Sequence, residues 1–330
     1  MLFPVNRQQV AAAEDPFPGP VGRAMIAGSM DPTLAPFDRR RLRQHRDRAV
    51  PGFREHDFLF KDVAERLAER LADFTRRFET ALDLGCHGGE LGRALTPTGK
   101  IDRLVQTDLS MSMARLAAQG GRPVLVADEE ALPFGPESFD LVMSNLSLHW
   151  VNDLPGALLQ IRHALKPDGL FLAAMFGAGT LVELRDALAE AESEIRGGAR
   201  PRVAPLPELR DAAGLLQRAG FALPVADHEF ITVTYADPFR LLADLRGMGE
   251  ASTLVAGAAL TRQSLMRAAE LYARRHADAD GRVPASFRIL FLAGWAPHES
   301  QQKALRPGSA KSRLADALEP DRLKSKRLET

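Results

Sequence analysis

Short apolar runs alternate with helix-like segments through the middle of this chain, and that alternation limits the possible folds more than any other feature. The runs have the length and composition of buried strands. They cover residues 80–84, 103–108, 124–127, 141–145 and 170–176. Strands that alternate with helices form a parallel sheet with helices on both faces, so the sequence predicts an α/β protein with a Rossmann-like sheet.

The segments on either side of this core complete the expected domain plan. Residues 1–36 are rich in Pro, Ala and Gly without periodicity, and they are predicted to be a disordered lead-in. Residues 37–300 are predicted to form the folded domain, with later strands at 221–235 and 287–295. A helical insertion is expected at about 238–280, before the last strand. Residues 301–330 are predicted to be a disordered basic tail.

The composition excludes several classes of protein. The 43 Lys and Arg residues balance the 43 Asp and Glu residues, which argues against a nucleic-acid partner. A single cysteine, Cys86, rules out an internal disulfide framework and suits a reducing compartment. No apolar run reaches the roughly 18 residues of a membrane span. The expected location is the cytoplasm, or the mitochondrial matrix for a eukaryotic source; the oligomeric state is not fixed by the sequence.

A glycine-containing turn and three acids mark the edge of the sheet where a ligand is expected. The string ALDLGCHGGE (81–90) is a strand that ends near Asp83, followed by a turn and a helix. Asp108 and Asp128 end the next two strands in the same way. Each acid alone is typical of a helix N-cap or a solvated turn. Three of them at the carboxyl ends of neighbouring parallel strands predict a site for an adenosine-containing ligand.

The glycine spacing indicates which adenosine ligand this is. Gly85, Gly88 and Gly89 do not fit the G-x-G-x-x-G dinucleotide motif, and no phosphate-binding Lys follows them. S-adenosylmethionine carries no phosphate and needs no such cradle. Asp108 can accept the ribose hydroxyls, Asp128 the adenine amine, and Asp83 can organise the turn. The residues predicted to contact the cofactor are Asp83, Gly85, Cys86, Gly89, Asp108, Leu109, Asp128, Glu129 and Asn145.

Several strings carry a resemblance to known families. DLGCHGGELGRAL, TDLS, ADEEALPF and LKPDG resemble the S-adenosylmethionine-dependent class I methyltransferases. SNLSLHWVNDLPGAL is similar to the malonyl-acyl-carrier-protein O-methyltransferases of biotin synthesis and to the complex I assembly factor of methyltransferase fold. The second resemblance continues through FDRRRLRQHRDRA, RGMGE, DGRVPASFRILFLAGW and HES, over roughly residues 37–300.

The resemblance implies a fold and a function. The fold is the class I methyltransferase sheet of seven mostly parallel strands. The assembly-factor family acts as an arginine hydroxylase on a subunit of the respiratory NADH:quinone oxidoreductase, which implies a protein substrate. Methylation of an acyl-carrier-bound intermediate is the alternative enzyme reaction. A non-catalytic factor that binds S-adenosylmethionine while escorting a partner is the third hypothesis.

The fourth strand leads into SNLSLHW (144–150), from which a substrate-facing loop is expected. Asn145 and His149 are the predicted catalytic residues, with His149 as a proton acceptor. The alternative for His149 is a residue tied into the fold, and Trp150 is expected to pack. No catalytic triad and no iron-binding set of two His and a carboxylate can be identified, so no metal ligands are predicted.

Two features of the sequence can each be interpreted in more than one way. His87 stands where the related families carry a glycine, and an accommodated turn residue is the favoured interpretation over a catalytic or metal-binding one. The basic segment at 37–49 is either a solvated helix face or a lid over the ligand.

Overall fold

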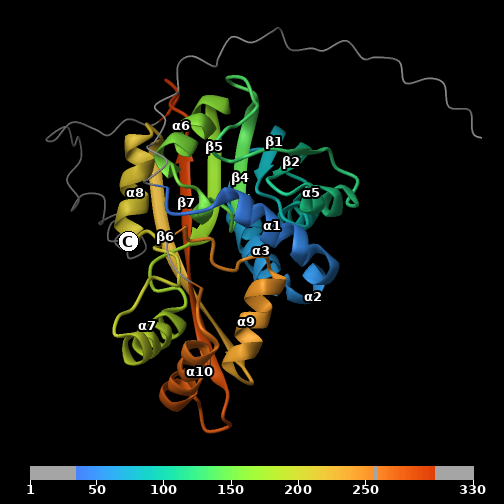
Figure 1. Ribbon diagram of the computed structural model, residues 1–330. Coiled ribbons are helices and arrows are strands. Elements are labelled where there is room, and N and C mark those ends of the chain that lie inside the picture. Colours follow the sequence, from blue (N-terminus) through green and yellow to red (C-terminus); the bar gives the residue numbers. More distant parts are fainter. Residues whose placement is uncertain (1–34, 256–258, 302–330) are drawn as a thin grey trace, which may run out of the picture. The chain divides into compact units, whose positions relative to one another are not determined.

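The computed structural model describes residues 35–255 and 259–301. Seven strands form one sheet in the order β3-β2-β1-β4-β5-β7-β6 (Figure 1). Their bounds are β1 Phe78–Leu84, β2 Ile101–Asp108, β3 Val124–Val126, β4 Phe139–Asn145, β5 Leu165–Phe176, β6 Ala222–Tyr235 and β7 Val283–Trp295. β1 to β5 are parallel, and β7 is antiparallel to both β5 and β6. The predicted fold class is confirmed.

Strand order reverses between β1 and β4, and this reversal positions the ligand edge. From β1 the chain proceeds outward through β2 and β3, then returns to pair β4 with the other side of β1. In open α/β sheets the crevice for ligands opens at the carboxyl ends of the strands beside such a switch point. The turn after Leu84 and the segment after Asn145 both lie at that end.

Helices cover both faces of the sheet (Figure 1). Consecutive residues of β4 show this, because Leu141 and Met143 pack into one apolar cluster and Val142 into the other. Helices α3, α4, α7 and α10 contribute to the first cluster, and α6 and α8 to the second. The helices are α1 Arg39–Ala49, α2 Phe53–His56, α3 Phe58–Ala72, α4 Glu90–Leu95, α5 Met111–Ala118, α6 Leu154–Ala164, α7 Val182–Arg196, α8 Leu209–Arg218, α9 Pro238–Gly247 and α10 Arg262–His276.

Local details differ from the expectations. The turn expected at KPDG (166–169) lies inside β5, where the pairing with β4 shifts register between Phe139 and Leu141, so this turn bulges out of the ladder. The segment at 238–280 contains two separate helices, α9 and α10, before β7. Pro36, placed in the lead-in from sequence, accepts a hydrogen bond from the Val255 N–H at 3.0 Å.

The predictions of disorder at residues 1–34 and 302–330 lie outside the described part of the chain. Within the described part, no helix has the length and apolar character needed to cross a bilayer.

Candidate functional site

The turn that follows β1 is built from left-handed residues and close packing. Gly85 and Gly89 have φ of 73° and 86°, a region that glycine enters without strain. The Cys86 N–H donates to the Thr107 carbonyl at 2.8 Å, and the Gly89 N–H donates to the Cys86 carbonyl at 2.8 Å. Gly89 then precedes α4 as its N-cap. These bonds hold the turn against the carboxyl end of β2.

His87 fits this turn in place of a glycine. Its φ of 48° is left-handed, and its ring packs on Phe60 with centroids 4.3 Å apart. Nε2 lies 3.1 Å from the Leu146 carbonyl oxygen, which the ring can reach as a donor. Burial, together with the charge of Arg46, lowers the pKa of His87 to about 4, so the ring is neutral at physiological pH. The imidazole lies on the α3 side of the turn, where it contributes packing.

Gly85 is so closely packed that a methyl group there should be poorly tolerated. An added Cβ would lie 2.2 Å from Ser147 Oγ, and the positive φ at this position would be strained for alanine as well. We expect Gly85→Ala to lower the free energy of unfolding by about 3 kcal/mol or more, from overlap plus backbone strain. The matched control is Gly99→Ala, because Gly99 has φ +60° but open space around its Cβ position. Denaturant melts that give equal losses for both variants would contradict this packing.

Asp108 and Glu129 converge on one buried guanidinium. Arg46, from α1, places Nη1 3.2 Å from Asp108 Oδ2 and 3.6 Å from Glu129 Oε1, and all three side chains are inaccessible to solvent or nearly so. Ser147 Oγ donates to Glu129 Oε1 at 2.6 Å and accepts from Arg46 Nη2 at 2.9 Å. Burial alone would raise the pKa of Glu129, but Arg39 and Arg46 outweigh it and lower that pKa to about 2.

Asp108 also holds the turn. Its Oδ2 accepts the His87 N–H at 3.0 Å, and its Oδ1 accepts the Ser110 N–H at 2.7 Å. The carboxylate therefore joins the β1 turn, the start of α5 and helix α1. The neighbouring residue Leu109 packs beside the small cluster of Phe37, Leu42 and Trp150.

A second arginine of α1 binds the other acids of this edge. Arg39 Nη2 lies 2.6 Å from Asp128 Oδ1 and also pairs with Glu129, while Nη1 donates to the Trp150 carbonyl at 3.3 Å. Arg39 and Arg46 are seven residues apart, two helical turns, so they lie on one face of α1. The sequence analysis interpreted this segment as either a solvated helix face or a lid over the ligand. In the structure its inner face covers the predicted cofactor edge.

The acids fit the adenosyl group expected here. Asp108 is the last residue of β2 and Asp128 follows the adjacent strand β3, and both offer oxygens that accept N–H donors. Ribose hydroxyls and an adenine amine are donors of the same kind. Sequence reasoning did not identify Arg39 and Arg46; their spacing of seven within a basic helix was the available signal.

Asp83 is separate from this group. Its Oδ2 accepts from Gln106 Nε2 at 2.8 Å, and Oδ1 has no hydrogen-bond partner among the described residues. Burial raises the pKa of Asp83 to about 7. Its fully buried carboxyl pairs with Gln106 of β2 instead of sharing a partner with Asp108 and Glu129.

The raised pKa of Asp83 predicts a pH-dependent effect of Asp83→Asn. The folded state binds this proton more tightly than the unfolded state, so the wild type loses stability as pH rises from about 4 to about 7. The variant lacks that loss, so its stability relative to wild type should increase across this window, by at most about 1.4 kcal/mol per pH unit. Urea melts from pH 4 to 8 measure this, with the exposed Asp102→Asn as control. A difference that stays flat with pH would contradict it.

His149 forms a buried pair with Glu250, a residue that sequence reasoning noted only within RGMGE. His149 Nε2 lies 2.9 Å from Glu250 Oε2, which also accepts from Trp150 Nε1 at 2.6 Å. Burial alone would raise the pKa of Glu250, but its hydrogen bond and charge interaction with His149 lower it. An ionised carboxylate only accepts, so His149 donates through Nε2. In the neutral form of the ring Nδ1 is the nitrogen with the lone pair, and this buried atom has no hydrogen-bond partner among the described residues.

Asn145 and Cys86 have structural roles. Asn145 Nδ2 donates to the Phe60 carbonyl at 2.9 Å, so the amide ties β4 to α3. It is not among the residues that line the cavity described next, and its predicted contact with the substrate stays a prediction. Cys86 is buried, and burial raises the pKa of its thiol. The two predicted catalytic residues are thus separated, since His149 reaches the cavity and Asn145 does not.

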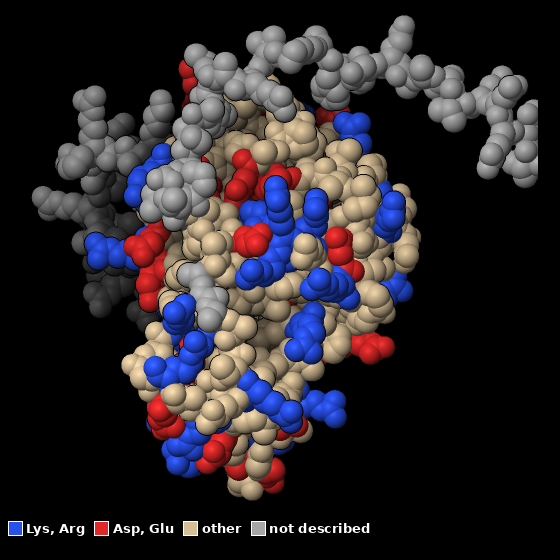
Figure 2. Space-filling model, in the orientation of Figure 1, with Lys and Arg blue, Asp and Glu red and all other residues tan. Residues whose placement is uncertain are grey.

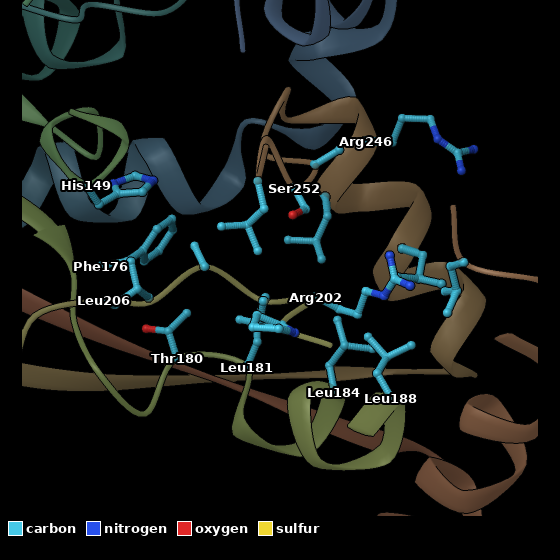
Figure 3. Close-up of a pocket in the computed structure, with 18 of the residues that line it drawn as sticks. His149, Phe176, Thr180, Leu181, Leu184, Leu188, Arg202, Leu206, Arg246 and Ser252 are labelled. Atoms are coloured by element: carbon cyan, nitrogen blue, oxygen red, sulfur yellow. The ribbon is translucent and has the colours of Figure 1, made fainter. Parts of the chain in front are cut away.

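An apolar cavity of about 420 Å³ opens beside His149 (Figure 3). Its walls come from β5, α7, α9, β7 and the segments at residues 201–206, 251–254 and 259–260. The larger apolar residues include Phe176, Leu181, Leu184, Leu188, Leu206, Leu242, Leu245 and Phe287. Arginines 41, 202 and 246 also line it, and none of its described lining residues is an Asp or Glu. Its size is typical of small-molecule and side-chain sites.

Across the described residues, no group of three or more His, Cys, Asp or Glu side chains is arranged to hold a metal ion.

The strand order, the ligand edge and a family match together define a class. Residues 82–173 match the family described as a methyltransferase domain. With the 3-2-1-4-5-7-6 sheet, this makes the chain a class I methyltransferase-fold protein, and the predicted S-adenosylmethionine-dependent class is confirmed. The phosphoethanolamine N-methyltransferase 2 of Haemonchus contortus shares the fold, with a TM-score of 0.51 and 19% identity over 78% of this chain and 60% of that one.

Closer relatives define the family. The mitochondrial arginine-hydroxylase NDUFAF5 of Danio rerio is 40% identical over 294 residues, 88% of this chain and 91% of the relative. The chain belongs to the NDUFAF5 family. A malonyl-[acyl-carrier protein] O-methyltransferase of Halorhodospira halophila is 35% identical over 81% of this chain and 91% of its own length.

Proposed function

We propose that this protein uses S-adenosylmethionine while modifying a side chain of a partner protein during assembly of respiratory NADH:quinone oxidoreductase. One observation carries the proposal: 40% identity to an arginine-hydroxylase extends over 88% of the chain, far beyond residues 82–173 of the methyltransferase domain. A likeness limited to that domain would concern the cofactor alone. The observed similarity also includes α1 and the second half of the chain, which build the cavity.

The cofactor would be held by the edge formed by Asp108, Asp128 and the Gly85 turn. When bound, S-adenosylmethionine supplies an activated methyl group on a sulfonium. The protein's contribution is to orient and dehydrate this region, because displacement at a sulfonium depends mainly on alignment and a dry pocket. Arg39 and Arg46 donate to the same carboxylates, so the ligand's donors would have to share or replace their bonds.

His149 is the group suited to proton transfer. Glu250 accepts from its Nε2–H, which leaves Nδ1 of the neutral ring as the acceptor on a residue that lines the cavity. A base oriented by a carboxylate in this way can remove a proton from a substrate nucleophile. Glu250 acts through His149, so it is a positioning residue.

Mass spectrometry of the oxidoreductase subunits from a strain lacking this protein tests the proposal. We expect one subunit to lack a modification that the wild-type gene restores. A mass difference of one oxygen indicates hydroxylation, and a difference of one methylene indicates methylation. Identical masses in both strains would overturn the proposal. A variant lacking the His149 imidazole that still restores the modification would show that His149 is not the proton acceptor.

O-methylation of a malonyl group on an acyl carrier is the second candidate. The malonyl-[acyl-carrier protein] relative is 35% identical, and arginines without acids around the cavity would suit a substrate carboxylate. Incubation of the purified protein with malonyl-acyl-carrier protein and S-adenosylmethionine tests it. Formation of the methyl ester favours this candidate; an unchanged thioester, with a modified subunit in the cell, excludes it.

A further inference from the structure

Helix α1 carries arginines on two opposite faces. Arg39 and Arg46 point inward to the acids of the ligand edge. Arg40, Arg41, Arg43 and Arg48 are exposed, and Figure 2 shows Lys and Arg side chains gathered over this helix. Nothing in the proposed chemistry uses this outer face.

The outer charges are only partly offset within the described structure, where Arg43 interacts with the charge of Asp47. Arg40, Arg43 and Arg48 form no salt bridge with any described residue, and Arg41 lies 3.8 Å from Asp38, its only ionic partner there. Asp47, the other acid on the helix, accepts from Ser110 Oγ at 2.6 Å and points toward α5. The chain as a whole has equal numbers of acids and bases, so this excess of positive charge is local.

The basic face continues into the apolar cavity. Arg41 belongs to both, since it is exposed on α1 and also lines the cavity. Arg246, on α9, is a second exposed arginine of the lining. Inside, Leu184, Leu245 and Phe287 offer contact for an apolar group. Because no acid is among the described residues of the lining, a substrate guanidinium would find no counter-charge in that part of the wall.

The length of the basic face indicates what binds there. Arg40 and Arg48 are eight residues apart, which is about 12 Å along a helix. A single anionic head group pairs only within about 4 Å of a guanidinium, so it cannot reach both. A polypeptide with several carboxylates can. A large apolar anchor in a pocket surrounded by polar contacts is how protein interfaces gain most of their affinity.

We propose that the outer face of α1 and the cavity form one recognition surface for an acidic segment of a partner protein, which inserts an apolar side chain into the cavity. This rests on the proposed function, in which the substrate is a protein, and deepens it. The cavity anchors residues beside the modified one, and the carboxylates of the segment pair with Arg40, Arg41, Arg43 and Arg48. Binding on the outer face lies one helix diameter from the inner arginines at the cofactor edge.

Selection of a random peptide library displayed on phage, on the purified full chain, tests the surface without any reaction. We expect enriched peptides to combine Asp or Glu with a large apolar residue. A fluorescent peptide of the enriched sequence should bind at least about tenfold more weakly to Arg40→Glu/Arg43→Glu, and more weakly in high salt. The matched control is Arg210→Glu, on an exposed arginine of α8. Leu245→Trp, which fills the cavity, should also weaken binding, whereas the exposed Leu159→Trp should not.

Other outcomes overturn the proposal. Enrichment of basic peptides would show that the surface seats cations. Equal binding to the α1 variant and to Arg210→Glu would remove α1 from the interface. If no peptide is enriched, and the protein binds sodium dodecanoate in a way that Leu245→Trp abolishes, the cavity is a site for a small amphiphile. If the protein binds a random oligonucleotide and the α1 variant does not, the basic face is a site for nucleic acid. Each of these leaves the subunit mass analysis unaffected, so the two proposals fail separately.

Discussion

Arg46→Met should lower the free energy of unfolding by about 3–5 kcal/mol, the usual result of removing one partner from a buried ion pair. Arg46 is completely buried and is shared by Asp108, Glu129 and Ser147. Methionine fills much of the same volume. The loss of stability therefore comes more from the unpaired carboxylates than from a cavity. Urea unfolding followed by circular dichroism at pH 7 measures it.

The effect of Arg46→Met should shrink in acid. Glu129 has a depressed pKa in the folded wild type, so its charge interactions stabilise the fold above its unfolded pKa near 4.5 and are lost as pH falls toward 2. The deficit of the variant should therefore be smaller near pH 3 than at pH 7. Arg40→Met, on the exposed face of the same helix, is the control and should change stability by no more than about 0.5 kcal/mol. Equal losses in both variants would mean that the buried pairing contributes little.

His149→Ala should reduce the rate of subunit modification by about 10²–10⁴-fold, the range for loss of a general base. Glu250→Gln keeps the shape but removes the negative charge beside Nε2–H, so a smaller loss is expected. The acid limb of the pH profile should shift toward lower pH, because the protonated imidazole loses its counter-charge. The measurement is single-turnover modification of the subunit as a function of pH.

His163→Ala is the matched control for this experiment, because His163 is exposed near the end of α6. Its rate should equal that of the wild type. If His149→Ala retained the full rate while Glu250→Gln unfolded the protein, the pair would be a structural element and not a proton acceptor.

The fold was predictable because its signals are local. Each strand of the core is a short apolar run, and the acids that close β2 and β3 follow those runs directly. Left-handed conformation at His87 was also anticipated, since histidine enters that region more readily than most residues. These properties depend on neighbours within a few positions.

The partners of the site residues were not predictable, because they are distant in sequence. Arg46 meets Asp108 across 62 positions, and His149 meets Glu250 across 101. A basic helix has the same pattern whether its arginines face water or buried carboxylates. Nor does the sequence indicate that the Asn145 amide, at the end of β4, donates to the Phe60 carbonyl 85 positions away.

Calorimetric titration with S-adenosylmethionine tests the central claim most directly: that the carboxylates beside the Gly85 turn bind the adenosyl group. The wild type should bind one molecule per chain, and Asp108→Ala, checked for folding by circular dichroism, should bind at least about tenfold more weakly for the loss of charged hydrogen bonds. No binding to the folded wild type, or the same affinity in the variant, would contradict it.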